Sequence, residues 1–170
     1  VGNRTQINYM YELGMLDQEP LPTGQRTTFV SAPAVNTEAD LHDRMRSYFD
    51  SNCAHCHAPL PFGEIADKGL YLDYASMDPD EGTSFFSWGV CKPHASGGNG
   101  LDSDQPVDVV PGDPDSSFMV CRMDSVAAGE RMAPLGRTTV HTQGVELVRE
   151  WITELPNLFD GVAPGCPQPD

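Results

Sequence analysis

The sequence contains no membrane-spanning stretch and few basic residues. No run of about eighteen apolar residues occurs, so no segment is long and apolar enough to cross a bilayer as a helix. Lysine and arginine number 10, against 25 aspartates and glutamates, and the formal net charge is −15. Nucleic acids and anionic membrane surfaces would repel this chain, so neither is expected as a partner. Such a charge favours solubility or a basic protein partner.

A signal peptide and an internal repeat are also missing. The chain begins with Val1 rather than methionine, as expected of the mature or excised part of an exported protein. Its 170 residues, 39% of them hydrophobic, allow one domain with a buried core, and the 16 glycines and 15 prolines predict long irregular loops. We expect a monomeric domain in the periplasm or outside the cell.

Cysteine and histidine are scarce, with five of each, yet two of each lie within five positions. The stretch CAHCH at 53–57 matches C-x-x-C-H, the attachment signature of c-type haem. Two thiols at this spacing can form thioethers with the two vinyl groups of the haem, and the imidazole of the next residue can reach the iron. The sequence therefore predicts one covalently bound haem held by Cys53, Cys56 and His57.

Two other readings of these residues stay open. A zinc-binding interaction module would add His94 or His141 as a fourth ligand to the three residues of the motif. Structural zinc sites more often show a second paired C-x-x-C or H-x-x-x-H, and the sequence has neither. A dithiol redox centre would need a βαβ context, whereas the neighbourhood of the motif reads as helical.

A haem that carries electrons needs a second axial ligand, and Met132 is the strongest candidate. It lies in the segment GERMAPLGR (129–137), whose proline and glycines can present a thioether to the iron outside regular structure. His94 or His141 would instead make the iron bis-histidine. An open sixth position would suit a peroxidase-like enzyme or a gas-binding site. The other methionines are assigned to the core (Met45, Met119, Met123), to an acidic loop (Met77) and to the N-terminal segment (Met10, Met15).

Apolar residues at helical spacing predict an all-α fold of three to four helices with long loops wrapped around one haem. The predicted helices cover residues 4–15, 37–53, 114–123 and 144–155. Between them we expect a strap at 18–36 and loops over 58–112, with a short extended piece at 105–112. The domain organisation expected is an N-terminal helix and strap packed on the domain (1–36), a cytochrome c domain (37–156) and a C-terminal tail (157–170).

Local signals also predict where the helices begin and end. Thr37 and Asp40 resemble a capping box before the helix that runs into the motif. Asp113 and Pro114 suit the N-cap and first position of the next helix. Pro156 should close the last helix. The apolar faces are Leu41, Met45, Tyr48 and Phe49 on the first of these helices, and Val145, Val148, Ile152 and Leu155 on the last.

Four blocks follow one another in an order that resembles a known family: YFDSNCAHCHAP, GVCKPHASGG, VDVVPGDPDSSFMVCRM and RMAPLGRTTVHTQGVELVREWI. Over roughly residues 4–156 the chain resembles bacterial monohaem cytochrome c domains, which often form the C-terminal end of secreted multidomain proteins, some linked to carbohydrate oxidation. The resemblance implies electron transfer, with Met132 as the sixth ligand. It also implies a redox partner such as a copper-dependent lytic polysaccharide monooxygenase or a quinoprotein dehydrogenase.

The chain departs from this family at two places. Ala133 follows the methionine where the family has proline, so the ligand loop is expected to differ slightly. The tail 157–170 looks like an addition and carries Cys166, while Cys121 stands where relatives use an aromatic or aliphatic residue. These two unusual cysteines imply a Cys121–Cys166 disulfide that tethers the tail. Cys91–Cys121 is the next alternative, and other pairings or free thiols stay open.

Several side chains are expected either to support the haem or to lie away from it. His57 should donate its Nδ1–H to a backbone carbonyl in the proline-containing loop after the motif. His42 and His55 are expected at the surface. Phe49 and Trp151 are assigned to packing between the first and last core helices. Candidates for haem-edge or propionate contacts are Trp88, Arg131, Arg137 and Tyr71.

Acidic residues cluster in segments 76–82 and 101–108. Neither segment matches the calcium-loop pattern D-x-D-x-D-G-x₅-E, so a solvated acidic face is preferred to a calcium site. The sequence thus predicts an electron carrier rather than an enzyme, with one iron cycling between its ferric and ferrous states. One exposed haem edge, ringed by carboxylates, should receive a basic partner.

Overall fold

The structure, a computed structural model, describes residues 5–20, 41–59, 69–81, 84–94, 105–134 and 136–167. Its elements are α1 (Gln6–Glu12), α2 (Leu41–Asn52), the short 3-10 helices η3 (Pro79–Glu81) and η4 (Phe85–Trp88), α3 (Phe118–Asp124) and α4 (Thr142–Leu158). Within these ranges there is no strand, and two isolated bridges join Val90 to Val109 and Pro93 to Val107. The all-α prediction is therefore confirmed, and within the extended piece predicted at 105–112 Val107 and Val109 form the two bridges.

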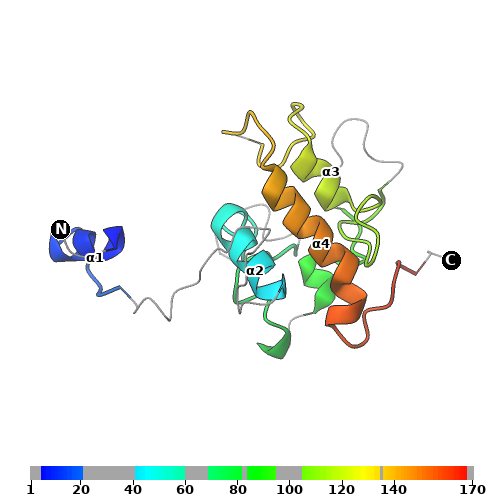
Figure 1. The fold of residues 1–170 in the computed structure, drawn as a ribbon, viewed down its shortest axis with the longest axis horizontal. Helices are drawn as coiled ribbons and strands as arrows, with labels where there is room; N and C mark the ends of the chain where they lie inside the picture. Colours follow the sequence, from blue (N-terminus) through cyan, green and yellow to red (C-terminus); the bar gives the residue numbers. More distant parts are fainter. Residues whose placement is uncertain are drawn as a thin grey trace.

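The core forms where α4 packs against both α2 and α3 (Figure 1). The apolar face predicted for α2 is the face that is buried: Met45 and Phe49 completely, Tyr48 almost so and Leu41 partly. The predicted face of α4 is buried as well, together with Trp151. The rings of Phe49 and Trp151 meet edge to face with centroids 6.3 Å apart, which confirms that they pack where these helices cross.

Gly144 allows the closest approach between α2 and α4. A Cβ atom at this position would lie 2.3 Å from the hydroxyl oxygen of Tyr48 and 2.6 Å from its Cε2, well inside van der Waals contact. The same hydroxyl lies 3.3 Å from Nδ1 of His141, the residue just before α4. The missing side chain of Gly144 therefore seats the tyrosine ring directly against α4.

Replacing Gly144 with alanine is expected to lower the free energy of unfolding by a net of about 1–3 kcal/mol, because the added methyl group displaces the Tyr48 ring and with it the α2–α4 contact. This outweighs the gain of about 1 kcal/mol that alanine brings over glycine inside a helix. Urea unfolding measures the difference. The exposed neighbour variant Gln143→Ala is the matched control and should stay within about 0.5 kcal/mol of wild type. Equal stability of the two variants would contradict this packing.

The last helix does not end at Pro156, as the sequence predicts, but continues to Leu158 with the proline inside its final turn. Proline has no N–H to donate to the carbonyl four residues earlier, which belongs to Ile152. That carbonyl instead accepts a hydrogen bond of 2.8 Å from the backbone N–H of Gly112. A donor from a distant loop thus replaces the missing one, and the helix can pass through the proline.

The third helix begins at Phe118 rather than at the predicted Pro114. Asp113 caps a turn instead, because its carboxylate accepts hydrogen bonds from the N–H and the hydroxyl of Ser116, at 3.1 and 2.7 Å. The first two N–H groups of α3 donate to the backbone carbonyls of the extended segment 107–108. Pairing with this segment, rather than a side-chain cap, sets the start of the helix.

His42 is buried, although the sequence predicts a surface position. Its Nδ1 accepts a hydrogen bond of 3.2 Å from the Trp151 indole N–H, so its Nε2 carries the proton and donates to the carbonyl of Met77 at 2.8 Å. Its ring also stacks on Trp88, with centroids 5.2 Å apart. Met77, predicted in an acidic loop, is itself fully buried. A histidine with both ring nitrogens bonded can occupy a core position that its polarity alone would not suggest.

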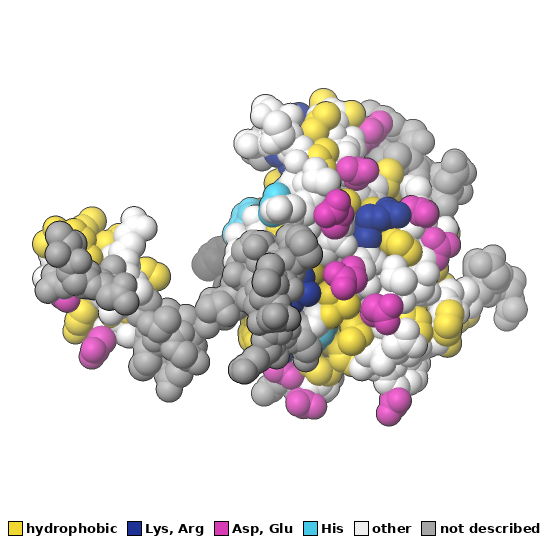
Figure 2. All heavy atoms as spheres, in the orientation of Figure 1, with side chains coloured by type: hydrophobic (Ala, Val, Ile, Leu, Met, Phe, Trp, Pro, Cys, Tyr) yellow, Lys and Arg dark blue, Asp and Glu magenta, His cyan; other side chains and the backbone are white. Residues whose placement is uncertain are grey.

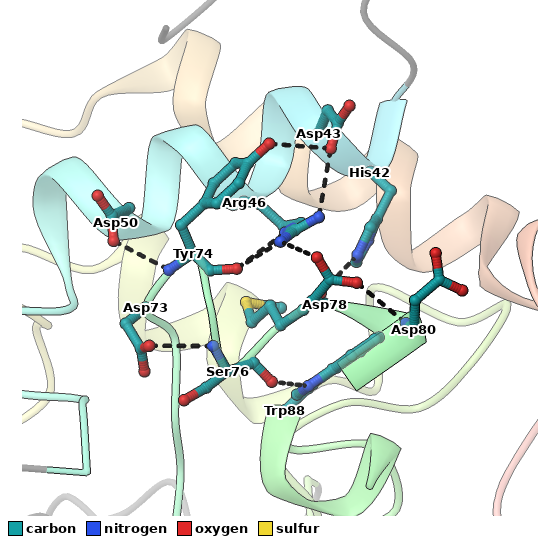
Figure 3. A network of polar contacts seen from close by, with 11 residues as sticks. His42, Asp43, Arg46, Asp50, Asp73, Tyr74, Ser76, Asp78, Asp80 and Trp88 are labelled. Carbon is teal, nitrogen blue, oxygen red and sulfur yellow. Dashed lines mark hydrogen bonds and ion pairs between the residues drawn. The ribbon is translucent and has the colours of Figure 1, made fainter. Parts of the chain in front are cut away.

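A network of polar contacts fastens α2 to the loop before η3 (Figure 3). Arg46 donates to the carbonyl of Tyr74 at 2.6 Å and to the carboxylate of Asp78 at 3.0 Å. Trp88 donates its indole N–H to the carbonyl of Ser76 at 2.8 Å and is fully buried. Trp88, predicted as a haem-edge candidate, is therefore a core residue of this region.

α1 confirms the helix predicted near the N-terminus, with Thr5 as its N-cap. None of its residues is buried, and in Figure 1 it lies apart from α2, α3 and α4. Residues 21–40, which hold most of the predicted strap and the capping box at Thr37 and Asp40, lie outside the described residues. The packing of the N-terminal part on the domain stays a prediction.

The C-terminal tail is joined to the domain by a disulfide between Cys91 and Cys166, whose Cα atoms are 5.3 Å apart. The predicted pairing of Cys121 with Cys166 is wrong, and so is the alternative of Cys91 with Cys121. The tail follows the extended segment rather than α3, because the N–H of Gly165 donates to the carbonyl of Pro111 at 2.8 Å. Cys121 keeps a half-buried thiol on α3.

Candidate functional site

The C-x-x-C-H motif forms a helical turn that continues α2. The N–H groups of Cys56 and His57 both donate to the carbonyl of Cys53, at 3.0 and 2.9 Å. The N–H of Cys53 in turn donates to the carbonyl of Phe49 at 2.7 Å. Residues four apart lie one above the other on such a turn, so Cys53 and His57 share a face. Cys53 is half-buried and His57 is buried, while Cys56 is exposed.

Two adjoining cavities meet at this face. The first has a volume of about 150 Å³ and the second of about 330 Å³. They share four lining residues: Cys53, His57, Met123 and Met132. Cys56 lines the second cavity. The structure therefore brings together all four residues that the sequence assigns to haem binding, although they come from two distant parts of the chain.

The walls of the two cavities differ in exposure. Buried side chains line most of the first cavity, among them Phe49, Leu72, Phe118 and Met119. Exposed residues line much of the second, among them His55, Pro134, Thr139 and His141. Core residues therefore line the first cavity, called here the interior end of the site, and surface residues line the second, its surface end, while both cavities are partly open to solvent.

Burial shifts the pKa of two motif residues. Burial lowers the pKa of His57, whereas the backbone of Leu70 raises that pKa by a smaller amount. Burial also raises the pKa of the Cys53 thiol to about 12. Nδ1 of His57 is buried and makes no hydrogen bond of good geometry to a described residue, so the predicted donation to the following loop is not seen among them. The imidazole is held neutral, the form in which a ring nitrogen binds a metal.

The candidates for a second axial ligand are distributed differently around the cavities. Met132 lines both cavities, as His57 does, whereas His94 lines the first and His141 the second. Met123 also lines both, which the sequence does not indicate, but it belongs to the core cluster with 8% of its surface exposed. Of the candidate ligands, the two methionines thus line both cavities and each histidine lines one, and Met123 joins Met132 as a candidate.

Arg137 holds the loop that carries Met132. Its guanidinium donates to the backbone carbonyls of Met132 and Met123, so one side chain ties the loop to α3. Arg137, a haem-edge candidate from the sequence, also lines the second cavity. Arg131 and Tyr71, selected with it, line neither cavity. Arg131 instead donates to carbonyls of its own loop.

Four polar residues line the first cavity, and of these only His94 was selected from the sequence, as an alternative ligand. Lys92 and Asp108 form a buried ion pair, with Nζ 3.5 Å from Oδ2. His94 stacks on Phe118 with ring centroids 4.2 Å apart, and Arg122 lines the same space. Asp108 is thus buried rather than on the solvated acidic face predicted for its segment. The available signal was the pair of basic residues in GVCKPHASGG, within a chain that has few.

No aspartate or glutamate appears among the described residues that line the second cavity. Acidic side chains lie elsewhere: Figure 2 shows them scattered over the face that α4 crosses, with few lysines or arginines among them. The predicted ring of carboxylates around an exposed haem edge is therefore not found at this opening. His55, His141 and Arg137 line it instead.

Other metal sites receive no support from the part of the chain that the structure describes. It contains no group of three or more His, Cys, Asp or Glu side chains arranged to hold a metal ion. Cys53, Cys56, His57 and His141 line the second cavity together, but among the described residues they are not arranged to hold a metal ion as the zinc reading requires. The described part of segment 76–82 likewise forms no calcium site, and residues 101–104 of the second acidic segment lie outside the described residues.

Comparisons with protein-family models, with curated proteins and with solved structures find no match to this chain. Across the described ranges, none of the helices has the length and apolar character needed to span a bilayer. The function has to be inferred from the chemistry of the site itself.

Proposed function

We propose that this chain is the electron-carrying domain of a c-type cytochrome, with one haem bound covalently to Cys53 and Cys56 and ligated by His57 and Met132. A cytochrome c-like arrangement of helices and loops around the haem is part of this proposal. The observation that supports it is the convergence of these four side chains on one pair of adjoining cavities.

The residues present fit such a group. The donor set combines two thiols at C-x-x-C spacing with a neutral imidazole and a thioether, and no carboxylate stands among the residues that both cavities share. Apolar side chains supply most of the remaining wall, as a flat, largely apolar ring requires. They include Phe49, Leu70, Leu72, Phe118 and Val145.

The chain has three tasks at this site: to position the ligands, to exclude water and to set the potential. When bound, the haem supplies reversible one-electron chemistry between ferric and ferrous iron. Burial keeps the imidazole of His57 neutral, and Arg137 fixes the loop that presents Met132. Buried aromatic and aliphatic side chains keep water from the interior end. A thioether ligand and apolar surroundings both raise the reduction potential.

The electron would enter and leave at the second cavity, where Cys56 is exposed. We propose a redox protein of the periplasm or the extracellular space as the partner. A copper polysaccharide monooxygenase or a quinoprotein dehydrogenase is the class that the family resemblance implies. Because no carboxylate lines the opening among the described residues, we expect weak contact through neutral, histidine and arginine side chains, with rapid dissociation.

The absorption spectrum of protein made in a host able to attach haem tests this function. We expect a sharp α-band after reduction with dithionite and, in the oxidised protein, the weak near-infrared band of methionine-ligated ferric haem. The pigment should stay with the protein after denaturation and solvent extraction, and Cys53→Ala/Cys56→Ala should release it. A high-spin spectrum that changes with carbon monoxide would favour the peroxidase-like or gas-binding alternative. Colourless wild-type protein would overturn the proposal and leave the zinc module to be tested.

A further inference from the structure

The first cavity gathers basic side chains at the end away from Cys56. Lys92, His94 and Arg122 line it, and none of them lines the second cavity, where Cys56 lies. Lys92 is only 6% exposed, and Nδ1 of His94 is buried with no hydrogen-bond partner among the described residues. One carboxylate, that of Asp108, accompanies them in the described lining. Lys92 is buried and His94 and Arg122 are half-buried beside apolar walls, a setting that favours the binding of a further anion.

The chemistry of a haem attached at the motif identifies that anion. The two vinyl groups, which become thioethers, lie on one side of the porphyrin, and the two propionates lie on the other. Attachment at Cys53 and Cys56 would therefore leave the propionates for Lys92, His94 and Arg122, which line the first cavity and not the one that Cys56 lines. We infer that Lys92, His94 and Arg122 form a carboxylate-binding site that receives the haem propionates, an assignment that rests on the proposed function.

Each of the three side chains is held where it can serve this purpose. The ammonium group of Lys92 carries three N–H donors, and its Nζ lies 3.5 Å from Oδ2 of Asp108. The group can therefore also donate a hydrogen bond to a second carboxylate. Stacking on Phe118 fixes the ring of His94. Nε of Arg122 donates to the carbonyl of Glu130 at 3.0 Å and anchors the guanidinium beside the cavity. Asp108 then shares Lys92 with a propionate rather than filling the site alone.

Infrared difference spectra between oxidised and reduced holoprotein test the site, with the propionate carboxylates marked by ¹³C through a labelled haem precursor. His94→Phe keeps an aromatic ring to stack on Phe118 and removes the Nδ1 donor. Lys92→Met/Asp108→Asn removes both charges of the pair, so that no buried charge is left alone. Arg149 lies on the surface of α4 and lines neither cavity, so Arg149→Gln, which removes a positive charge, is the control.

We expect the labelled carboxylate bands to shift in His94→Phe and in the double variant, and to stay in place in Arg149→Gln. Lys92→Met alone should weaken the equilibrium constant for reduction about tenfold, equivalent to about 59 mV, because a buried cation is lost beside the haem. Unshifted bands in both site variants, in protein with a normal haem spectrum, would overturn the propionate site. Absence of haem from the wild-type protein would instead overturn the proposed function.

Discussion

Replacing Met132 with alanine is expected to convert a low-spin haem into a high-spin one that binds carbon monoxide when reduced. Met132 lines both cavities beside His57, and the methyl group of alanine cannot reach where its thioether does. Loss of the thioether removes a ligand that favours ferrous iron, so the equilibrium constant for reduction should fall at least tenfold, or about 59 mV. Disappearance of the near-infrared band reports the loss of the methionine ligand. Spectroelectrochemistry on the same sample measures the fall in the equilibrium constant for reduction.

Met123→Ala is the matched control for this substitution, because Met123 lines the same two cavities but is packed in the core on α3. It should keep the near-infrared band while losing about 2–5 kcal/mol of stability, as expected for truncation of a buried methionine. The reverse pattern, with the band lost in Met123→Ala and kept in Met132→Ala, would show that Met123 is the ligand.

Removing the disulfide with Cys91→Ala/Cys166→Ala is expected to destabilise the protein by about 4 kcal/mol. The bond closes a chain segment with a sequence separation of 75, and a loop of this length restricts the unfolded chain strongly. For a domain of this size the melting temperature should fall by about 8–16 °C. Thermal and urea unfolding of the holoprotein measure the loss.

Cys121→Ser provides the control for that experiment. Cys121 is a half-buried thiol outside the disulfide, so its replacement should change stability by no more than about 0.5 kcal/mol. If Cys121→Ser proved as damaging as the double variant, the tail would be tethered to α3 after all.

Features that depend on near neighbours in sequence could be predicted, and features decided by distant segments could not. The buried faces of α2 and α4 follow from helical periodicity, which is a local property. The start of α3 and the end of α4 depend on hydrogen bonds to the extended segment 107–112, and both predictions were wrong by several residues. Asp113 predicts a helix start and Pro156 a helix end from local sequence alone. In the structure, acceptors at 107–108 set the start of α3, and the N–H of Gly112 lets α4 continue past the proline.

The candidate site divides in the same way. Spacing alone identifies Cys53, Cys56 and His57, because the chemistry of attachment needs all three within one turn. Lys92 and Asp108 are 16 positions apart and meet only because the bridge between residues 90–93 and 107–109 aligns them. The disulfide was missed for the same reason, since the tail lies along this bridge rather than along α3.

The bridge between 90–93 and 107–109 also ties together four parts of the chain. Hydrogen bonds join its two sides, and the Cys91–Cys166 disulfide bonds the tail to it. Just beyond it, Gly112 donates to the carbonyl of Ile152 in α4, which has no partner from Pro156. Lys92 and Asp108 project from this cross-linked wall into the interior cavity. When the charge beside this wall changes, the dipoles of the wall are already fixed and need not reorient. In the proposed electron carrier, such a wall would lower the reorganisation energy of electron transfer and so speed the exchange of electrons.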